Sequence, residues 1–177
     1  MALDVETGSG SATSESYASV ADADTYAVAY IPGCDWQDSL DAQKERALRL
    51  ATQAIDAQNQ SRWQGNRASG TQALSWPRSG VEVDGYTLAS TLIPTTLKNA
   101  TIELAVKYRT DPTTSLVPDN TAPGTIVEEF VKVGDIEERV KYSGGKGNGT
   151  SYTLVENLLA PLTHGGSADL VGTMERA

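Results

Sequence analysis

The residues able to carry out nucleophilic, acid–base or metal chemistry are few in this sequence. Its 177 residues include one histidine, His164, and one cysteine, Cys34. A nucleophilic site needs a base beside the nucleophile and a third group that orients the base. A zinc site needs three or four ligands. Because neither set can be assembled here, we expect no enzymatic activity, no metal and no cofactor, with Cys34 a partly buried structural thiol.

Two further patterns have the residue types of a site but lack its spacing. The run Gly144-Gly-Lys-Gly is similar to a phosphate-binding loop, but such a loop places Ser or Thr after the lysine, and here Gly147 follows Lys146. Glutamate pairs at 128–129 and 137–138 could serve acid–base catalysis. Because they flank a turn on strand positions that face solvent, we interpret them as a negatively charged surface.

Residues 63–81 combine large aromatic and cationic side chains without an acid or a thiol. Trp63, Arg67, Trp76 and Arg78 interleave the two types, and this combination can stack bases and hold a phosphate backbone. One interpretation is therefore a single-stranded-DNA interface. The other is structural: both tryptophans cover the open end of a helix bundle, Trp76-Pro77 fixes an extended turn, and the arginines pair with acids nearby or on a neighbouring copy.

The charge balance favours the structural interpretation. The chain has 14 Lys and Arg against 23 Asp and Glu, a net charge of −9. Residues 1–40 hold acids and no base, residues 41–110 are mildly basic, and residues 111–177 are acidic again. Since nucleic-acid affinity comes mainly from basic side chains that neutralise phosphates, this composition suits a surface that DNA passes without sticking.

The composition is that of a globular domain, with 39% apolar and 21% charged residues. No apolar run approaches the roughly 18 residues of a membrane span. No base precedes residue 41, so we expect no signal sequence. The single cysteine excludes an intramolecular disulfide, and synthesis in a reducing cytosol is expected.

Apolar periodicity predicts three helices, at about 20–30, 38–58 and 94–109. Ser19 is the predicted cap of the first helix, Asp38 or Ser39 begins the second, and Pro94 suits the first turn of the third. Three amphipathic helices suffice for a small bundle. The predicted buried stripes are Ala47, Leu48, Ala51, Ala54 and Ile55, then Leu97, Ala100, Thr101, Leu104, Ala105 and Tyr108, whereas Lys44, Glu45, Arg49 and Gln53 fall largely off the stripe.

The pattern changes to strand alternation after residue 112. Residues 126–133 and 136–142 alternate in hydropathy around Gly134-Asp135, which predicts an antiparallel hairpin. A two-stranded hairpin alone is marginal in water, so we expect it to pair with the body or with a neighbouring subunit. A short helix follows at 152–160.

The predicted fold class is mainly α: a small α-helical bundle with an inserted antiparallel β-hairpin and extended N- and C-terminal segments. Residues 1–16, rich in Gly and Ser, are expected to be a flexible arm. Residues 17–162 form one domain, with a helical body at 17–112, the hairpin at 126–142 and the last helix at 152–160. Residues 163–177 are expected to be a tail.

Several motifs occur in a distinctive order. They are Ser16-Tyr-Ala-Ser-Val-Ala-Asp-Ala-Asp-Thr-Tyr26, Ala47-Leu-Arg-Leu-Ala-Thr-Gln-Ala-Ile-Asp56, Trp63-x-Gly65-x-Arg67, Gln72-Ala-Leu-x-Trp-Pro-Arg78-x-Gly80-Val, Ile93-Pro94 and Ala100-x-x-Glu103-Leu-Ala. This order resembles the head-tail adaptor (connector) proteins of tailed bacteriophages, some of whose relatives are labelled DnaT-like single-stranded-DNA-binding proteins. The Gln-x-Leu-x-Trp-Pro-Arg core is the most specific part.

The resemblance implies a non-catalytic protein of the virion neck, present in the host cytoplasm during assembly. Such proteins form rings of twelve copies between the portal protein and the stopper or tail, and double-stranded DNA passes through an acidic channel without specific binding. No membrane is implied. The alternative, a single-stranded-DNA-binding accessory protein of replication, stays open. The expected subunit or portal contacts are Trp63, Arg67, Trp76, Pro77 and Arg78. The hairpin residues expected to meet the lumen, a neighbour or the tail are Glu128, Phe130, Lys132, Asp135, Glu137, Arg139 and Tyr142.

Overall fold

The computed structural model describes residues 2–113, 116, 128–133, 136–141 and 152–164. The chain divides into two compact units. Met1–Leu116 with Tyr152–Ala177 forms the first, which we call the helical body. Val117–Ser151 forms the second, which we call the hairpin unit. The two units are described separately.

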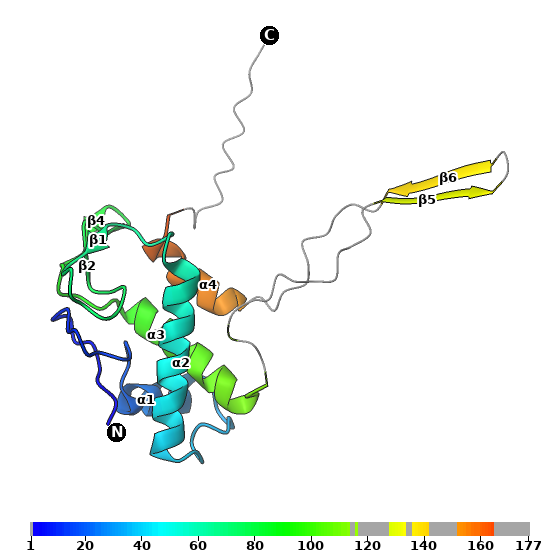
Figure 1. Cartoon of the computed structure of the whole chain (residues 1–177). Coiled ribbons are helices and arrows are strands. Elements are labelled where there is room, and N and C mark those ends of the chain that lie inside the picture. Colours follow the sequence, from blue (N-terminus) through cyan, green and yellow to red (C-terminus); the bar gives the residue numbers. More distant parts are fainter. Residues whose placement is uncertain (1, 114–115, 117–127, 134–135, 142–151, 165–177) are drawn as a thin grey trace, which may run out of the picture. The chain divides into compact units, whose positions relative to one another are not determined.

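In the described ranges, four α-helices build the helical body (Figure 1). They are α1 (Val20–Tyr30), α2 (Asp41–Asn59), α3 (Thr95–Thr110) and α4 (Thr153–Leu159), and α4 continues into the 3-10 helix η1 (Ala160–Leu162). α2 packs against α3, α3 also packs against α4, and α1 contacts both α2 and α3. The predicted fold class, mainly α with a small hairpin, is confirmed.

The helix starts follow from local hydrogen bonding. At α1, the Ser19 hydroxyl accepts from the Asp22 N–H at 3.0 Å and the Asp22 carboxylate accepts from the Ser19 N–H at 3.1 Å, so Ser19 is the predicted cap. α2 begins at Asp41, later than predicted. The Ser39 hydroxyl donates to the Asp35 carbonyl at 2.6 Å and accepts from Arg109, so it does not cap α2.

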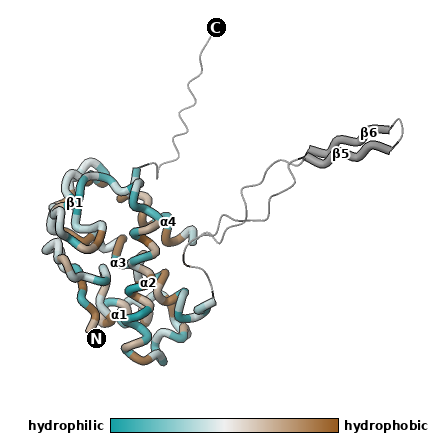
Figure 2. The backbone as a smooth tube through the Cα atoms, in the orientation of Figure 1, coloured by the Kyte–Doolittle hydropathy of each residue, from teal (hydrophilic) through white to brown (hydrophobic). Residues whose placement is uncertain are grey.

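The core lies between the helices and under the loop that joins α2 to α3. The predicted stripe of α2 is buried throughout, and so are the predicted α3 residues except the partly buried Tyr108. The largest fully buried side chains are Trp36, Trp76 and Tyr17. Figure 2 shows hydrophilic and hydrophobic residues intermixed along the helices, as expected when each helix buries one side.

The position of Lys44 differs from the predicted polar face of α2. Its side chain is buried, whereas the sequence pattern placed it off the apolar stripe. The Lys44 Nζ lies 2.9 Å from Asp24 Oδ1 and 5.8 Å from the centre of the Trp36 ring. Trp36 Nε1 donates to the same Asp24 oxygen at 2.8 Å. The ammonium is tolerated inside because it has a carboxylate and an aromatic face as partners.

Residues 2–16 also differ from the expected flexible arm. The buried Glu6 carboxylate accepts backbone N–H groups from Gly8 at 2.8 Å, Gly10 at 3.0 Å and Ser11 at 2.8 Å. The segment joins the body through the Ala73 N–H, which donates to the Ser11 carbonyl at 2.8 Å. One buried acid therefore organises a stretch whose Gly and Ser content alone indicates flexibility.

The loop between α2 and α3 contains two small antiparallel ladders that the sequence analysis did not predict. β1 (Asn66–Arg67) pairs with β2 (Arg78–Ser79), and β3 (Glu82–Val83) pairs with β4 (Tyr86–Thr87). Strands of two residues are too short to show a period of two.

The hairpin unit contains β5 (Glu128–Val133) and β6 (Ile136–Lys141), which pair antiparallel from Glu128↔Lys141 to Val133↔Ile136. This register confirms the predicted hairpin. The predicted contact residues Asp135 and Tyr142 lie outside the described residues, as do residues 165–177 of the predicted tail. None of the helices in the described ranges has the length and apolar content to cross a membrane.

Candidate functional site

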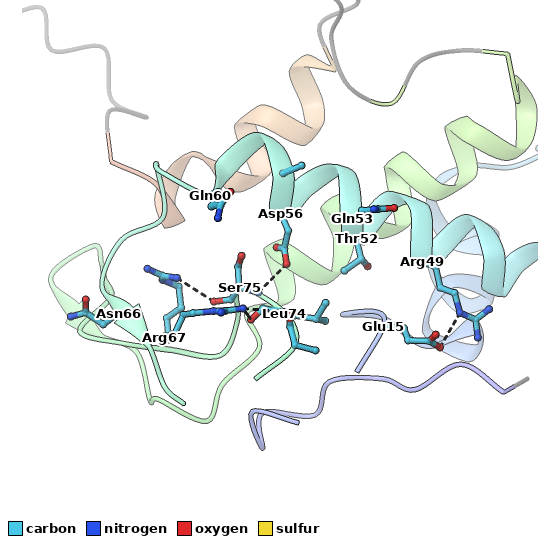
Figure 3. A pocket seen from close by; sticks show the side chains of 13 residues that line it. Glu15, Arg49, Thr52, Gln53, Asp56, Gln60, Asn66, Arg67, Leu74 and Ser75 are labelled. Atoms are coloured by element: carbon cyan, nitrogen blue, oxygen red, sulfur yellow. Dashed lines mark hydrogen bonds and ion pairs between the residues drawn. The ribbon is translucent and has the colours of Figure 1, made fainter. Parts of the chain in front are cut away.

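A polar groove of about 770 Å³ runs along α2 and the loop that follows it (Figure 3). Its lining includes three arginines, two carboxylates and several amides, and we call it the arginine groove. The lining residues are Glu15, Arg49, Thr52, Gln53, Asp56, Ala57, Gln60, Asn66, Arg67, Ala73, Leu74, Ser75 and Arg78.

Arg78 holds the loop in shape through backbone carbonyls. Its Nε donates to the Gln64 carbonyl at 2.6 Å, and its two terminal nitrogens donate to the carbonyls of Gly65 at 2.6 Å and Ser75 at 3.2 Å. Burial lowers the pKa of the Arg78 guanidinium from its usual value, and the nearby Arg67 charge adds to this effect. Arg78 is therefore mainly a structural cation, since its donors are used within the loop.

Arg67 lies opposite Arg78 in the β1–β2 ladder and is exposed. One of its terminal nitrogens donates to the carbonyls of Ala73 at 3.3 Å and Leu74 at 2.8 Å. Within the described part of the chain, neither Arg67 nor Arg78 lies within salt-bridge distance of a carboxylate. The groove therefore presents positive charge that no ion pair in the described residues neutralises.

A buried tyrosine and a carboxylate fix the floor of the groove to the core. The Tyr17 hydroxyl donates to Asp56 Oδ1 at 2.6 Å, and the Ser75 N–H donates to Asp56 Oδ2 at 2.9 Å. Burial raises the pKa of Asp56, although the hydrogen bonds from Tyr17 and Ser75 and the charge of Arg67 act in the opposite direction. Burial also raises the pKa of Tyr17 well above its usual value, and Asp56 adds to that shift.

Arg49 and Glu15 close the other end of the groove. Arg49 Nε lies 2.9 Å from a Glu15 oxygen, and a second Arg49 nitrogen lies 3.5 Å from Glu45. The hydrogen bond from Arg49 is the main cause of the lowered pKa of Glu15. This pair also connects residues 2–16 to α2.

The two tryptophans of residues 63–81 fill the interior. Trp63 is 4% exposed and Trp76 is fully buried, and their rings meet edge to face with centroids 5.9 Å apart. Pro77 is buried and follows Trp76 through a cis peptide bond. These three side chains therefore pack within the chain's own loop, and their predicted contact with a subunit or the portal stays a prediction. In this fold the buried tryptophan rings present no open face for base stacking.

The structure brings Arg67 and Arg78 together at the groove, and their predicted contact with a partner stays a prediction. In the described structure, the hydrogen-bond acceptors of both arginines are backbone carbonyls rather than the acids that the structural interpretation proposed. Three residues important for the loop escaped the sequence analysis as site residues: Tyr17, Asp56 and the buried Gln72. The Gln72 amide donates to the carbonyls of Leu74 at 2.9 Å and Pro77 at 3.0 Å.

The lining determines which chemistry the groove can offer. Guanidinium and amide groups can bind carboxylates, phosphates or peptide groups. Among the residues that the structure describes, no aromatic side chain lines the groove. Among the described residues, no three His, Cys, Asp or Glu side chains are grouped so that they could hold a metal ion.

The fold and groove define a small, mainly α-helical protein organised around a packed tryptophan–arginine loop. The model of the family described as "Putative DnaT-like ssDNA binding protein" matches residues 1–177, and the chain belongs to this family. Neither a curated protein nor a solved structure matches the chain.

Proposed function

We propose that this protein is a non-catalytic, ring-forming adaptor that connects the portal of a tailed bacteriophage to its stopper or tail. The hairpin unit is the observation that carries this proposal. β5 and β6 pair with each other over six residues each and belong to a compact unit of their own. Since a two-stranded hairpin is marginal in water, a neighbouring copy or the tail protein would supply its missing partner.

The helical body supports the same proposal. The aromatic side chains that a base-stacking protein would present are used to pack residues 63–81. The surface of the helical body therefore has exposed charges and polar grooves, which suit contact with another protein. The resemblance to phage adaptors described above supplies the particular partners and the twelve-fold ring.

The net charge agrees with a role around passing DNA. At −9, the chain repels phosphates when many copies surround a channel. A neck protein that held DNA tightly would obstruct ejection.

Sedimentation of the full chain with and without a broken hairpin tests the proposal. Val131→Pro removes a backbone donor from β5, and proline is poorly tolerated inside a strand. We expect the parent to form a multi-copy species and Val131→Pro to remain monomeric with unchanged helical circular dichroism. Val131→Thr, which keeps the backbone N–H and a β-branched side chain at the same position, is the matched control and should assemble. A parent chain that stays monomeric at every concentration would contradict the proposal.

A second candidate is single-stranded-DNA binding, which the description of the family favours. The exposed Arg67 and the amides of Gln60 and Asn66 could contact phosphates in the arginine groove. Anisotropy of a fluorescently labelled oligo-dT strand, measured over a salt series, decides this candidate. Affinity that falls steeply with salt and depends on Arg67 would support it, whereas no binding at low salt would remove it. A labelled strand is preferable to tryptophan quenching because Trp63 and Trp76 are buried.

A further inference from the structure

A second surface of the helical body has the charge and apolar character that complement the arginine groove. Immediately before and at the start of α2, three exposed acids, Asp35, Asp38 and Asp41, flank the exposed Leu40 in the sequence. Leu40 is 71% exposed, although it is a large apolar residue. We call these four residues the acidic corner.

The charges of the acidic corner are not satisfied by ion pairs among the described residues. The salt bridges there involve Asp24, Glu15 and Glu45 instead. Arg109 reaches this region, but it donates to the Ser39 hydroxyl at 3.1 Å and to Gln43 at 3.4 Å rather than to a carboxylate of the corner. The corner therefore presents carboxylates around one apolar side chain.

The groove offers the matching features. Arg67 is exposed and has no ion pair in the described part of the chain, and Gln60 and Asn66 add exposed amides. The same lining includes Ala57, Ala73 and Leu74, which can receive an aliphatic side chain. An acidic segment with a central leucine fits this combination of cations and small apolar residues.

The groove extends along α2 from Arg49 to Gln60. Gln60 follows the end of α2 opposite Asp41, and 19 residues of helix span about 28 Å, so the Gln60 end of the groove does not meet the acidic corner of the same copy. Complementary patches at opposite ends of a rigid element produce head-to-tail contacts between copies, and such contacts close into a ring when the rotation allows it.

We infer that the arginine groove of one copy binds the acidic corner of the next copy, an inference that rests on the proposed ring. A single-stranded nucleic acid is the less suitable occupant, because the described residues that line the groove include no aromatic side chain on which bases could stack.

Charge exchange between the two surfaces tests the inference on the full chain. Gln60→Glu with Asn66→Asp acidifies the groove isosterically, and no side-chain hydrogen bond of the described structure is assigned to either residue. Asp35→Lys with Asp38→Lys reverses the corner without changing the first residue of α2. We expect each pair to weaken self-association about tenfold in sedimentation, and all four substitutions in one chain to restore it.

Asn99→Asp with Lys107→Gln changes the net charge as much as the groove variant does, but on α3, and should assemble like the parent. The inference is overturned if the parent assembles while the groove variant assembles equally well, or if the four-substitution chain stays dissociated although circular dichroism shows it folded. It is also overturned if the groove variant loses binding to labelled oligo-dT but keeps self-association. A parent that never assembles overturns the proposed ring itself. A parent that assembles together with an unaffected groove variant overturns only this inference, so the two failures can be distinguished.

Discussion

The Tyr17 hydroxyl donates a 2.6 Å hydrogen bond to Asp56 Oδ1 and joins the segment before α1 to the last turn of α2. The same hydroxyl accepts from the Trp76 N–H at 3.2 Å, so one buried group orients both the helix and the loop of the arginine groove. The shape of the groove therefore depends on a residue that does not line it.

Tyr17→Phe should destabilise the protein by about 2 kcal/mol, because it removes a hydrogen bond to a largely buried carboxylate and leaves the Trp76 N–H without its acceptor. The free energy of unfolding in urea measures this loss. Tyr86→Phe, at a residue that is 78% exposed, is the matched control and should be nearly neutral. Equal stability of the two variants would contradict the assigned role of Tyr17.

Asp56 should make stability fall with rising pH relative to a variant that cannot titrate. Its pKa is raised above the usual 3.8 in the folded state, chiefly by burial, so the folded chain holds this proton more tightly than the unfolded chain. The stabilising effect is complete below 3.8 and is lost as pH rises through the folded pKa. The difference in unfolding free energy between the parent and Asp56→Asn should therefore decrease across this window in urea titrations.

Glu15 provides an internal comparison of opposite sign for that experiment. Its pKa is lowered from 4.5, first by the hydrogen bond from Arg49, so its contribution is present above 4.5 and is lost as pH falls through the folded pKa. The difference between the parent and Glu15→Gln should increase with pH. If both differences changed with pH in the same direction, the direction of the pKa shift assigned to one of the two residues would be incorrect.

Asp24→Asn should cost about 2 kcal/mol, because it leaves the buried Lys44 ammonium without its carboxylate and weakens the bond to Trp36. The cost is below that of a fully buried pair because the Asp24 side chain is 45% exposed. Thermal and urea unfolding measure it. Lys44→Met in the Asp24→Asn background should recover much of the stability, and a further loss in the double variant would argue against this pairing.

Gly65→Ala should destabilise the loop by about 2 kcal/mol or more. Gly65 has a φ of +63°, and a Cβ there would lie 2.2 Å from the Ser79 carbonyl oxygen, across the β1–β2 ladder. Gly70→Ala is the matched control, since nothing lies within 4 Å of its Cβ position. Hydrogen exchange of the β1–β2 amides should accelerate in the first variant only, and unchanged exchange there would contradict this account.

The sequence predicted the helical core well because the buried apolar residues recur at helical spacing over a long stretch of chain. The stripe from Ala47 to Ile55 repeats over more than two turns, and the structure buries all of it. The hairpin was predictable because two alternating runs flank the sequence Gly134-Asp135. Trp63 and Trp76 were open to two interpretations, since an aromatic side chain suits both a core and a stacking surface.

Other features depended on contacts between distant residues. Nothing near Glu6 in sequence shows that its carboxylate will be buried, because its burial depends on packing against the rest of the body. Lys44 has the spacing of a surface residue and becomes internal only because Asp24 and Trp36 approach from other segments. The arginine groove combines Glu15, residues of α2 and residues 66–78, so no local pattern could reveal it.

Native mass spectrometry of the full chain, mixed with a single-stranded oligonucleotide at low salt, tests the central claim most directly. If the protein works through contact between its own copies, multi-copy species should appear over a concentration series and carry no oligonucleotide. Single chains that bind oligonucleotide, without any multi-copy species, would contradict the claim.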